Sequence, residues 1–438
     1  MDQDKKNKAW ILAVDMGYGH QRTAFGLRDL SINSIVNANN YLGIPKKDQL
    51  IWKSSRSFYE FFSNVKKIPL IGNLLFYVLI DKYQSISGYY PKRDLSGQSF
   101  NLKRVVGFIK RGWGEDLIKT LNGNPIPLIS TFYVPAFMAE EFNYQGPIFC
   151  MVCDADIARS WAPLNPKDTI IKYFAPCNWV QDRLKLYGVP EENVYLTGYP
   201  LPKENIGSNE EIVKRDFAFR LLNLDPKREY YKKYHRIIED YIGELPREAD
   251  HYLTLMFSVG GAGAQKEIGA ALIKSLKKKI QNRTLKLILS VGTRSEVKKY
   301  FLNQIKKLGM ETEIGQGIEI VFNQNKGDYF REFNYKLRKT DILWTKPSEL
   351  SFYAGLGLPI IIAPTIGSQE DFNKRWILHI GAGFLQENPK YADQWIFDLL
   401  EGGRLAEAAM DGFVEIEKKG AYNIEKIIES FQQNEKFF

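Results

Sequence analysis

The chain has 438 residues, 44% of them apolar and 25% charged, a composition that is typical of a soluble globular protein and excludes a disordered chain. A chain of this length is too long to fold around one hydrophobic core of ordinary size, so two domains are predicted. The formal net charge of +9 favours partners that carry phosphate, such as nucleotides, nucleic acid or an anionic membrane surface, and a solvated basic surface is the alternative.

The N-terminus and the cysteines indicate a cytoplasmic protein. Only a short apolar stretch precedes Asp15, and it lacks the apolar core of a secretory signal peptide. Three cysteines, Cys150, Cys153 and Cys177, suit a reducing compartment and give no disulfide framework. Cys150 and Cys153 form a CxxC in a strand-like run, where positions three apart point to opposite faces, so no zinc site is expected.

Strand-like runs alternate with helical runs in the first half of the chain, as in α/β proteins with parallel sheets. The predicted strands cover residues 10–15, 126–131, 147–154, 169–176 and 193–200. They predict a doubly wound, Rossmann-like domain over residues 1–207. A charged, helical segment at residues 208–250 follows as a linker or insertion.

One apolar run in this half, residues 68–80, is too short for a transmembrane helix, which needs about 20 residues. Aromatic residues and lysines flank it on both sides, so residues 58–93 resemble segments that lie on a membrane surface. A core helix under a loop is the alternative.

The second half repeats the alternation and predicts a second Rossmann-like domain over residues 251–420. Its predicted strands cover residues 253–265, which end in a glycine loop, and residues 285–292, 318–323, 341–347 and 359–364. The last helix, about residues 421–438, is predicted to pack back on the first domain.

The stretch AVDMGYGHQRTA, residues 13–24, places two glycines between the first strand and a helix. A dinucleotide-binding loop needs a third glycine for close packing of helix and strand, and Arg22 occupies that position, so a dehydrogenase is not indicated. Gly17 and Gly19 instead bring His20 to the edge of the sheet where open α/β folds bind ligands. His20 is a candidate general base, and a structural helix cap is the alternative.

A second glycine loop, SVGGAGAQ, also joins a strand to a helix. Gly260, Gly261 and Gly263 would leave backbone N–H groups free to face a phosphate at the helix N-terminus. Loops of this kind also occur as ordinary turns. This loop therefore indicates phosphate binding only together with other features of the sequence.

A third block runs from DILWTKPSEL to GSQEDFNKR. Ser348 is predicted to cap a helix whose first turn contains Glu349, where the helix dipole favours a carboxylate. Gln369 and Glu370 offer hydrogen bonds to sugar hydroxyls, and Asn373 follows one turn into the next helix. The alternative is that Glu349 only interacts with the helix dipole and that the loop with Gln369 and Glu370 is a solvated connection.

In this order the blocks resemble GT-B glycosyltransferases, in particular the group of monogalactosyldiacylglycerol synthases, processive diacylglycerol glucosyltransferases and the peptidoglycan N-acetylglucosaminyltransferase. The resemblance lies in DMGYGHQRTA, ISTFYVPAFMAEEF, the stretch from CDADIARSW to VYLTGYP, SVGGAGAQ, and TKPSEL with GLGLPIIIAP and GSQEDFN. It covers most of the chain except about residues 35–125 and 208–250. It implies two Rossmann-like domains that face each other across a cleft.

The resemblance implies an inverting, metal-independent hexosyltransferase that uses a nucleotide sugar, often UDP-linked, with no cofactor and no nucleic-acid partner. The implied acceptor is a lipid or membrane-proximal molecule, which suggests a peripheral protein at the inner face of the membrane. His20 would act as general base or position the acceptor, and the second glycine loop and Ser348 would lie at the diphosphate. Gln369 and Glu370 would contact the hexose.

The chain departs from the family at one position. Members usually have a ribose-binding glutamate seven residues before the proline of the GLP element, and here that position is Phe352, with Glu349 the nearest carboxylate. A non-catalytic sugar-nucleotide-binding protein is therefore an alternative, and a UDP-N-acetylglucosamine 2-epimerase is a weaker one. A metal site at Asp154 and Asp156, as in the other glycosyltransferase fold, is a further competing interpretation.

Overall fold

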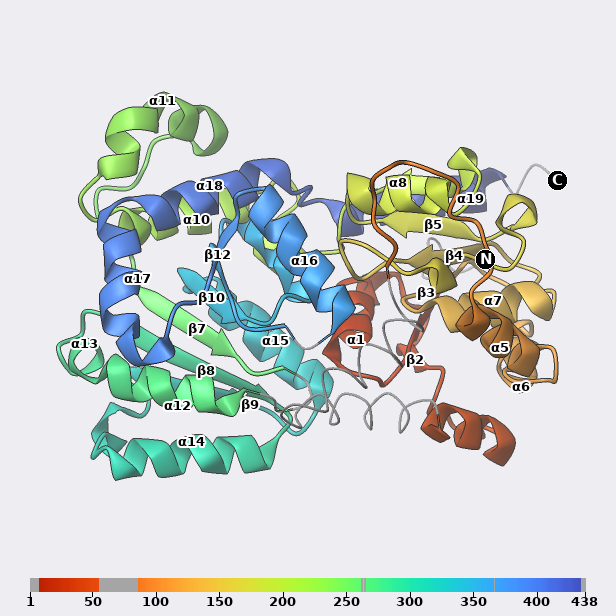
Figure 1. The fold of residues 1–438 in the computed structure, drawn as a ribbon, viewed down its shortest axis with the longest axis horizontal. Helices are drawn as coiled ribbons and strands as arrows, with labels where there is room; N and C mark the ends of the chain where they lie inside the picture. The colour runs from red at the N-terminus through yellow and green to blue at the C-terminus, as the bar shows by residue number, and fades with distance from the viewer. Residues whose placement is uncertain (1–7, 55–85, 261–262, 264, 366, 435–438) are drawn as a thin grey trace. The chain divides into compact units, whose positions relative to one another are not determined.

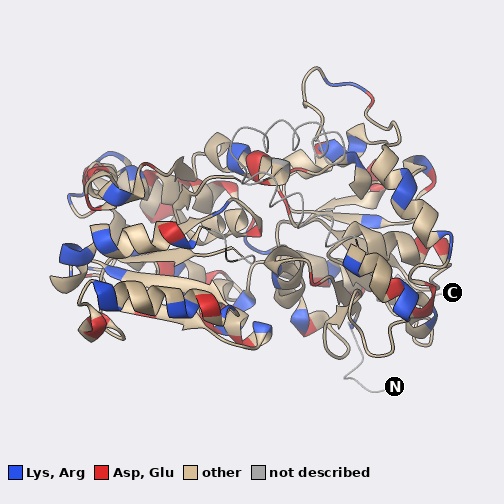
Figure 2. Cartoon of the chain, turned by 60° about the horizontal axis from the view of Figure 1, so that its bottom comes forward, with Lys and Arg blue, Asp and Glu red and all other residues tan. Residues whose placement is uncertain are grey.

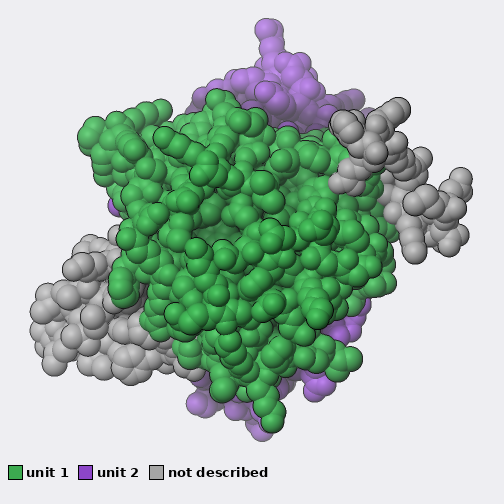
Figure 3. All heavy atoms as spheres, turned by 90° about the vertical axis from the view of Figure 1, so that its right-hand side faces the viewer, with its two compact units in different colours: residues 1–200, 366–373, 419–438 green, residues 201–365, 374–418 purple. Residues whose placement is uncertain are grey.

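The computed structural model describes residues 8–54, 86–260, 263, 265–365 and 367–434. The chain divides into two compact units, which Figure 3 colours separately. Unit 1 comprises Met1–Pro200, Ile366–Asn373 and Lys419–Phe438, and unit 2 comprises Leu201–Thr365 and Lys374–Lys418.

Unit 1 contains a six-stranded parallel sheet in the order β2-β1-β3-β4-β5-β6. The strands are β1 (Trp10–Ala13), β2 (Val36–Asn37), β3 (Leu128–Ser130), β4 (Ile148–Met151), β5 (Lys172–Ala175) and β6 (Val194–Leu196). The helices are α1 (Tyr18–Gly26), α5 (Phe100–Ile109), α6 (Glu115–Leu121), α7 (Tyr133–Glu141), α8 (Asn178–Leu186) and α19 (Gly420–Asn434). Helices lie on both faces of the sheet (Figure 1).

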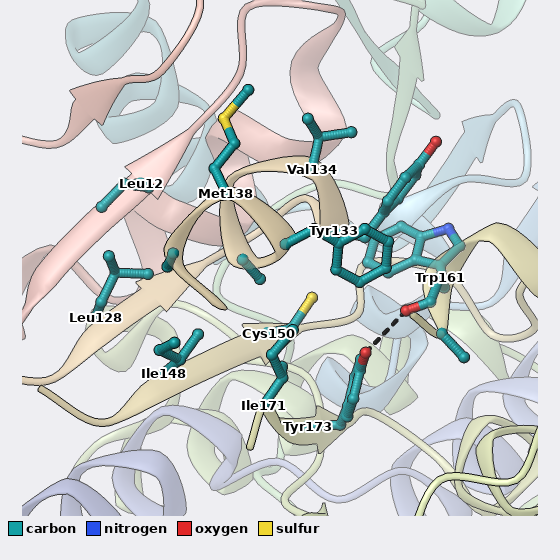
Figure 4. Packing of buried hydrophobic residues seen from close by; sticks show 14 of the residues in the cluster. Leu12, Leu128, Tyr133, Val134, Met138, Ile148, Cys150, Trp161, Ile171 and Tyr173 are labelled. Carbon is teal, nitrogen blue, oxygen red and sulfur yellow. Dashed lines mark hydrogen bonds between the residues drawn. The ribbon is translucent and has the colours of Figure 1, made fainter. Parts of the chain in front are cut away.

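The strands of unit 1 are apolar on both faces because helices cover both faces. All four residues of β4 are buried, and Leu128, Ile148 and Cys150 pack in one cluster with residues of α7 (Figure 4). The Tyr173 hydroxyl donates a hydrogen bond to the main-chain oxygen of Trp161 at 2.9 Å, which satisfies a polar atom in this core.

Unit 2 contains a second six-stranded parallel sheet in the order β12-β11-β10-β7-β8-β9. Its strands are β7 (Thr254–Ser258), β8 (Lys286–Gly292), β9 (Ile318–Phe322), β10 (Ile342–Thr345), β11 (Ile360–Ile362) and β12 (Gly383–Leu385). Its helices are α9 (Lys203–Ile206), α10 (Glu211–Leu224), α11 (Glu229–Ile242), α12 (Lys266–Ser275), α13 (Lys277–Gln281), α14 (Ser295–Lys307), α15 (Lys326–Leu337), α17 (Ala392–Glu401) and α18 (Arg404–Glu415), while α16 (Ser368–His379) begins in unit 1.

The predicted doubly wound α/β fold is confirmed, and each of the ten predicted strands contains an observed one. The sequence did not indicate β2 or β12, which are two and three residues long. Helix α19 packs on unit 1, where the Gln432 side chain donates to the Lys8 oxygen at 2.8 Å. None of the helices in the described ranges has the length and apolarity that crossing a membrane requires.

Each sheet reverses its strand order once. In unit 1 the chain proceeds outward from β1 to β2 and then resumes at β3 on the other side, so β1 and β3 flank the reversal. In unit 2 the corresponding strands are β7 and β10. Open α/β sheets bind ligands beyond the carboxyl ends of the strands that flank such a reversal.

Candidate functional site

His20 lies at the reversal in unit 1. It belongs to the first turn of α1, which follows β1, and Gly17 precedes this helix with φ 126°, a backbone conformation that glycine adopts without strain. Thr131, which contacts His20, directly follows β3. The two strands that flank the reversal therefore both contribute to the surroundings of His20.

Thr131 holds the imidazole in one tautomer. His20 Nδ1 lies 2.7 Å from the main-chain oxygen of Thr131, and because that oxygen can only accept, Nδ1 carries the proton. The Thr131 hydroxyl also donates to the main-chain oxygen of His20 at 2.9 Å. The Cys153 thiol donates to the same Thr131 oxygen at 3.1 Å. Nε2 is thus the ring nitrogen whose lone pair can accept a proton.

The surroundings of His20 are aromatic and favour its neutral form. The ring centroid of Phe132 lies 4.8 Å away, and that of Trp161 lies 6.3 Å away. Burial lowers the pKa of His20 from 6.5 to about 4, and the hydrogen bond to Thr131 opposes this shift without cancelling it. The imidazole is therefore neutral at pH 7.

A further glycine, Gly26, was not singled out from the sequence. A Cβ atom at Gly26 would lie 2.2 Å from the main-chain oxygen of Pro200. At this position α1 therefore lies so close to the chain that only glycine fits. Arg22, one turn earlier, is buried. Helix α1 therefore makes its close contact at Gly26, and not at Arg22, which occupies the third glycine position of a dinucleotide-binding loop.

The second glycine loop lies at the reversal in unit 2, directly after β7. Gly260 lies against Lys346, whose Cε would be 2.6 Å from an added Cβ, and Gly263 has φ +69°. Arg294 lies beside Gly263, with its Cδ 3.1 Å from the position of a Cβ. Gly261 lies outside the described residues.

Two cations therefore flank the loop from the neighbouring strands. Lys346 directly follows β10 and Arg294 follows β8, and β10 and β8 pair with β7 on its two sides. Sequence reasoning missed both residues, although each stands within two positions of the end of a predicted strand. Two cations beside a glycine loop are suited to bind a diphosphate.

Ser348 is an N-cap, as predicted. Its hydroxyl accepts from the Leu350 N–H at 3.5 Å, but the segment that it caps, Glu349–Leu356, is a 3₁₀ helix. Glu349 in its first turn is buried. Phe352 is fully buried, and its ring lies 4.8 Å from that of Trp376, so this position has an apolar pair and no carboxylate.

Gln369, Glu370 and Asn373 belong to the first half of α16, which groups with unit 1, whereas Gly260, Gly263, Ser348 and Glu349 belong to unit 2. Gln369 and Glu370 are half-buried. The Asn373 side chain bonds to unit 1 at both ends: its oxygen accepts from the Ala155 N–H at 2.7 Å, and its nitrogen donates to Asp154 at 2.8 Å. Asn373, a candidate substrate-binding residue, therefore bonds within unit 1 through both its amide oxygen and its amide nitrogen.

The carboxylates of the Asp-Ala-Asp motif have protein partners. Asp156 accepts two hydrogen bonds from Arg183, at 2.8 and 2.7 Å, in a bidentate ion pair that is almost free of solvent. Asp154 accepts the Asn373 bond. Within the described part of the chain, no three His, Cys, Asp or Glu side chains are placed to hold a metal ion. Both carboxylates therefore take part in bonds within unit 1.

Together, the fold and the two reversal points define the class of the protein: two doubly wound α/β units in one chain, the domain composition of the GT-B fold. A family model described as a domain of unknown function, DUF6938, matches residues 244–429. A search of curated proteins returns no match.

Several solved structures are similar to the chain. MurG of Acinetobacter baumannii is 12% identical, with a TM-score of 0.49 over 97% of this chain and 99% of that one. A glycosyltransferase of Rickettsia africae is 13% identical, with a TM-score of 0.41 over 98% and 100% of the two chains. MnaA of S. aureus, solved with UDP, is 15% identical, with a TM-score of 0.47 over 78% and 84%.

Proposed function

We propose that the protein is an inverting, metal-independent glycosyltransferase that moves a hexose from a nucleotide sugar to a hydroxyl of a lipid or membrane-proximal acceptor. The proposed nucleotide of the donor is UDP. The observation that carries this proposal is the state of His20: a neutral imidazole, fixed by Thr131 in the tautomer that leaves Nε2 free to accept a proton, at the strand reversal of unit 1.

In the proposed reaction, Nε2 of His20 accepts the proton of the acceptor hydroxyl while its oxygen attacks the anomeric carbon of the donor. The bond from that carbon to the diphosphate oxygen breaks, and the nucleoside diphosphate leaves with the electron pair. Lys346 and Arg294, beside Gly260 and Gly263, would balance the negative charge that grows on the diphosphate.

The residues of unit 2 around Phe352 support a second candidate function. Phe352 and Trp376 present no carboxylate to ribose hydroxyls, and the nearest carboxylate along the sequence is Glu349, three residues before Phe352. A sugar-nucleotide-binding protein without transferase activity is consistent with that apolar pair. The two functions differ in turnover, because only a transferase releases free nucleotide in proportion to an acceptor.

The test is to incubate the purified chain with a panel of nucleotide sugars and a total lipid extract, and to measure nucleotide release. We expect release that the extract stimulates, with a loss of at least a hundredfold in His20→Gln, since general bases contribute roughly 10²–10⁴ in rate. His235→Gln, at an exposed position of α11, is the matched control and keeps full activity. Nucleotide binding without release would favour the second function, and stimulation by no lipid fraction would contradict the acceptor class.

A further inference from the structure

The surface of α11 in unit 2 has an exposed apolar stripe. Tyr234, Ile237 and Tyr241 are 41, 47 and 45% exposed. They follow one another at spacings of three and four residues, which places them on one face of a helix. The rings of Tyr230 and Tyr234 lie 4.8 Å apart, so the half-buried Tyr230 extends the stripe across a bend of the helix at Tyr234. Among the described residues, no other helix has three exposed large apolar side chains.

A different face of α11 attaches this helix to unit 2. Ile238 is buried, and together with Tyr231 it lines a small cavity that Leu221 of α10 also lines. Ile237 and Tyr241 lie about a quarter of a turn away from Ile238 around the helix. Helix α11 is at the outside of unit 2, beyond α10 and α18 (Figure 1). The apolar stripe is therefore open to a partner while the neighbouring face holds the helix in place.

The charges of α11 have a definite order along the helix. Charged residues occur on helices throughout the chain (Figure 2), so their number does not distinguish α11. The first half is basic and the second half is acidic: the exposed residues Lys232, Lys233 and Arg236 precede the exposed residues Glu239 and Asp240. A helix with this order of charges is complementary to a second copy of itself that runs in the opposite direction.

We propose that α11 pairs with α11 of a second copy of this chain, antiparallel and related by a two-fold axis. The stripe has the spacing of a coiled-coil heptad, with Tyr230 and Ile237 at d positions and Tyr234 and Tyr241 at a positions. Antiparallel pairing sets Tyr230 against Tyr241 of the second copy and Tyr234 against Ile237 of the second copy. The two-fold axis repeats each contact, so one short stripe supplies both sides of the interface.

The same register brings opposite charges together beside the stripe. Lys233 and Asp240 occupy g positions, which lie next to each other in an antiparallel pair, so each Lys233 faces Asp240 of the other copy. Within the described part of the chain, neither residue has an ion pair of its own. A parallel pair would place Lys233 against Lys233 and Asp240 against Asp240, and like charges at these positions repel. The charges therefore favour a second copy and fix its direction.

The contact is short, which sets the strength that we expect. Helix α11 has 14 residues, about two heptads, so the interface is smaller than that of a permanent dimer. Unit 2 already holds the helix folded, so association does not have to repay the cost of forming it. A reversible dimer that dissociates on dilution is therefore expected.

The test is sedimentation velocity of the full chain over a wide range of concentrations. Lys233→Asp and Asp240→Lys each replace two attractive contacts of the dimer with two repulsive ones, and each should weaken it roughly tenfold or more. In an equimolar mixture of the two variants every contact again joins an acid to a base, so we expect association close to that of the wild type. Recovery in the mixture also shows that both variants are folded. Lys299→Asp, at an exposed position of α14, is the matched control and should dimerise like the wild type.

Ile237→Ser tests the apolar stripe separately from the charges, and it should also weaken the dimer. A wild type that stays monomeric at every concentration would overturn the proposal, as would a dimer that none of the α11 variants weakens. Two weakened variants that do not recover when they are mixed would refute the antiparallel pairing. None of these measurements involves turnover, so a failure here is distinct from a failure of the transferase proposal.

Discussion

Replacing Asp156 with Asn separates a structural role of the Asp-Ala-Asp motif from a metal-binding one. Arg183 is completely buried and Asp156 is 3% exposed, so neither charge can be hydrated when its partner is lost. In Asp156→Asn the guanidinium would keep, among the residues that the structure describes, a hydrogen bond to the Ser87 oxygen at 3.0 Å and the ring of Tyr89 at 5.3 Å. Breaking a buried ion pair from one side costs about 3–5 kcal/mol, and we expect that loss here.

The assay is hydrogen exchange of peptides that cover β4 and β5, which reports on unit 1 alone, in a chain whose two units need not unfold together. Asp154→Asn is the control, because Asp154 bonds to an amide and not to a buried charge. We expect the control to lose about 1 kcal/mol. The double variant Asp156→Asn with Arg183→Met should recover most of the loss, since no uncompensated charge remains.

A loss below about 1 kcal/mol in Asp156→Asn would refute this reasoning, because it would mean that the buried guanidinium is hydrated or paired in another way. Normal exchange together with abolished turnover that Mg²⁺ or Mn²⁺ restores would instead indicate a metal-binding motif. With the structural role, chelation of divalent ions leaves turnover unchanged.

Three further predictions concern other parts of the chain. The kcat/KM of the proposed transferase should fall only as the pH drops towards about 4, because His20 must be neutral to accept a proton, and an acid limb near 6.5 would contradict the assignment. Gly260→Ala should weaken nucleotide binding about tenfold or more in calorimetry, since its Cβ would lie 2.6 Å from Lys346 Cε, while folding is kept. Although burial opposes it, hydrogen bonds to Asp341 and Asp250 raise the pKa of His251, so this group stabilises the fold below its unfolded pKa near 6.5 and loses that contribution as pH rises through the raised value. Thermal unfolding should therefore show His251→Gln to be more destabilising at pH 5.5 than at pH 9.

The sequence predicts those features that have a local cause. Alternation of apolar strands with helices gave ten of the twelve strands, and Ser348 was recognisable as a cap because a cap acts on its own helix. The bonds from Asn373 to Asp154 and Ala155 join residues more than 200 positions apart, and no local pattern reports such a contact.

The candidate site residues that could not be predicted from the sequence share a physical origin. Thr131 acts on His20 because β3 pairs with β1, and Lys346 and Arg294 reach the glycine loop because β10 and β8 pair with β7. A motif that lies in one strand and the following helix contains the residues from only one of the two strands that flank a reversal. The residues from the second strand can be located only when the order of the strands in the sheet is known. The polar residues directly after the strands that pair across a reversal are therefore the ones to examine first in a doubly wound unit. In this chain that rule selects Thr131 and Lys346, neither of which belongs to a glycine motif.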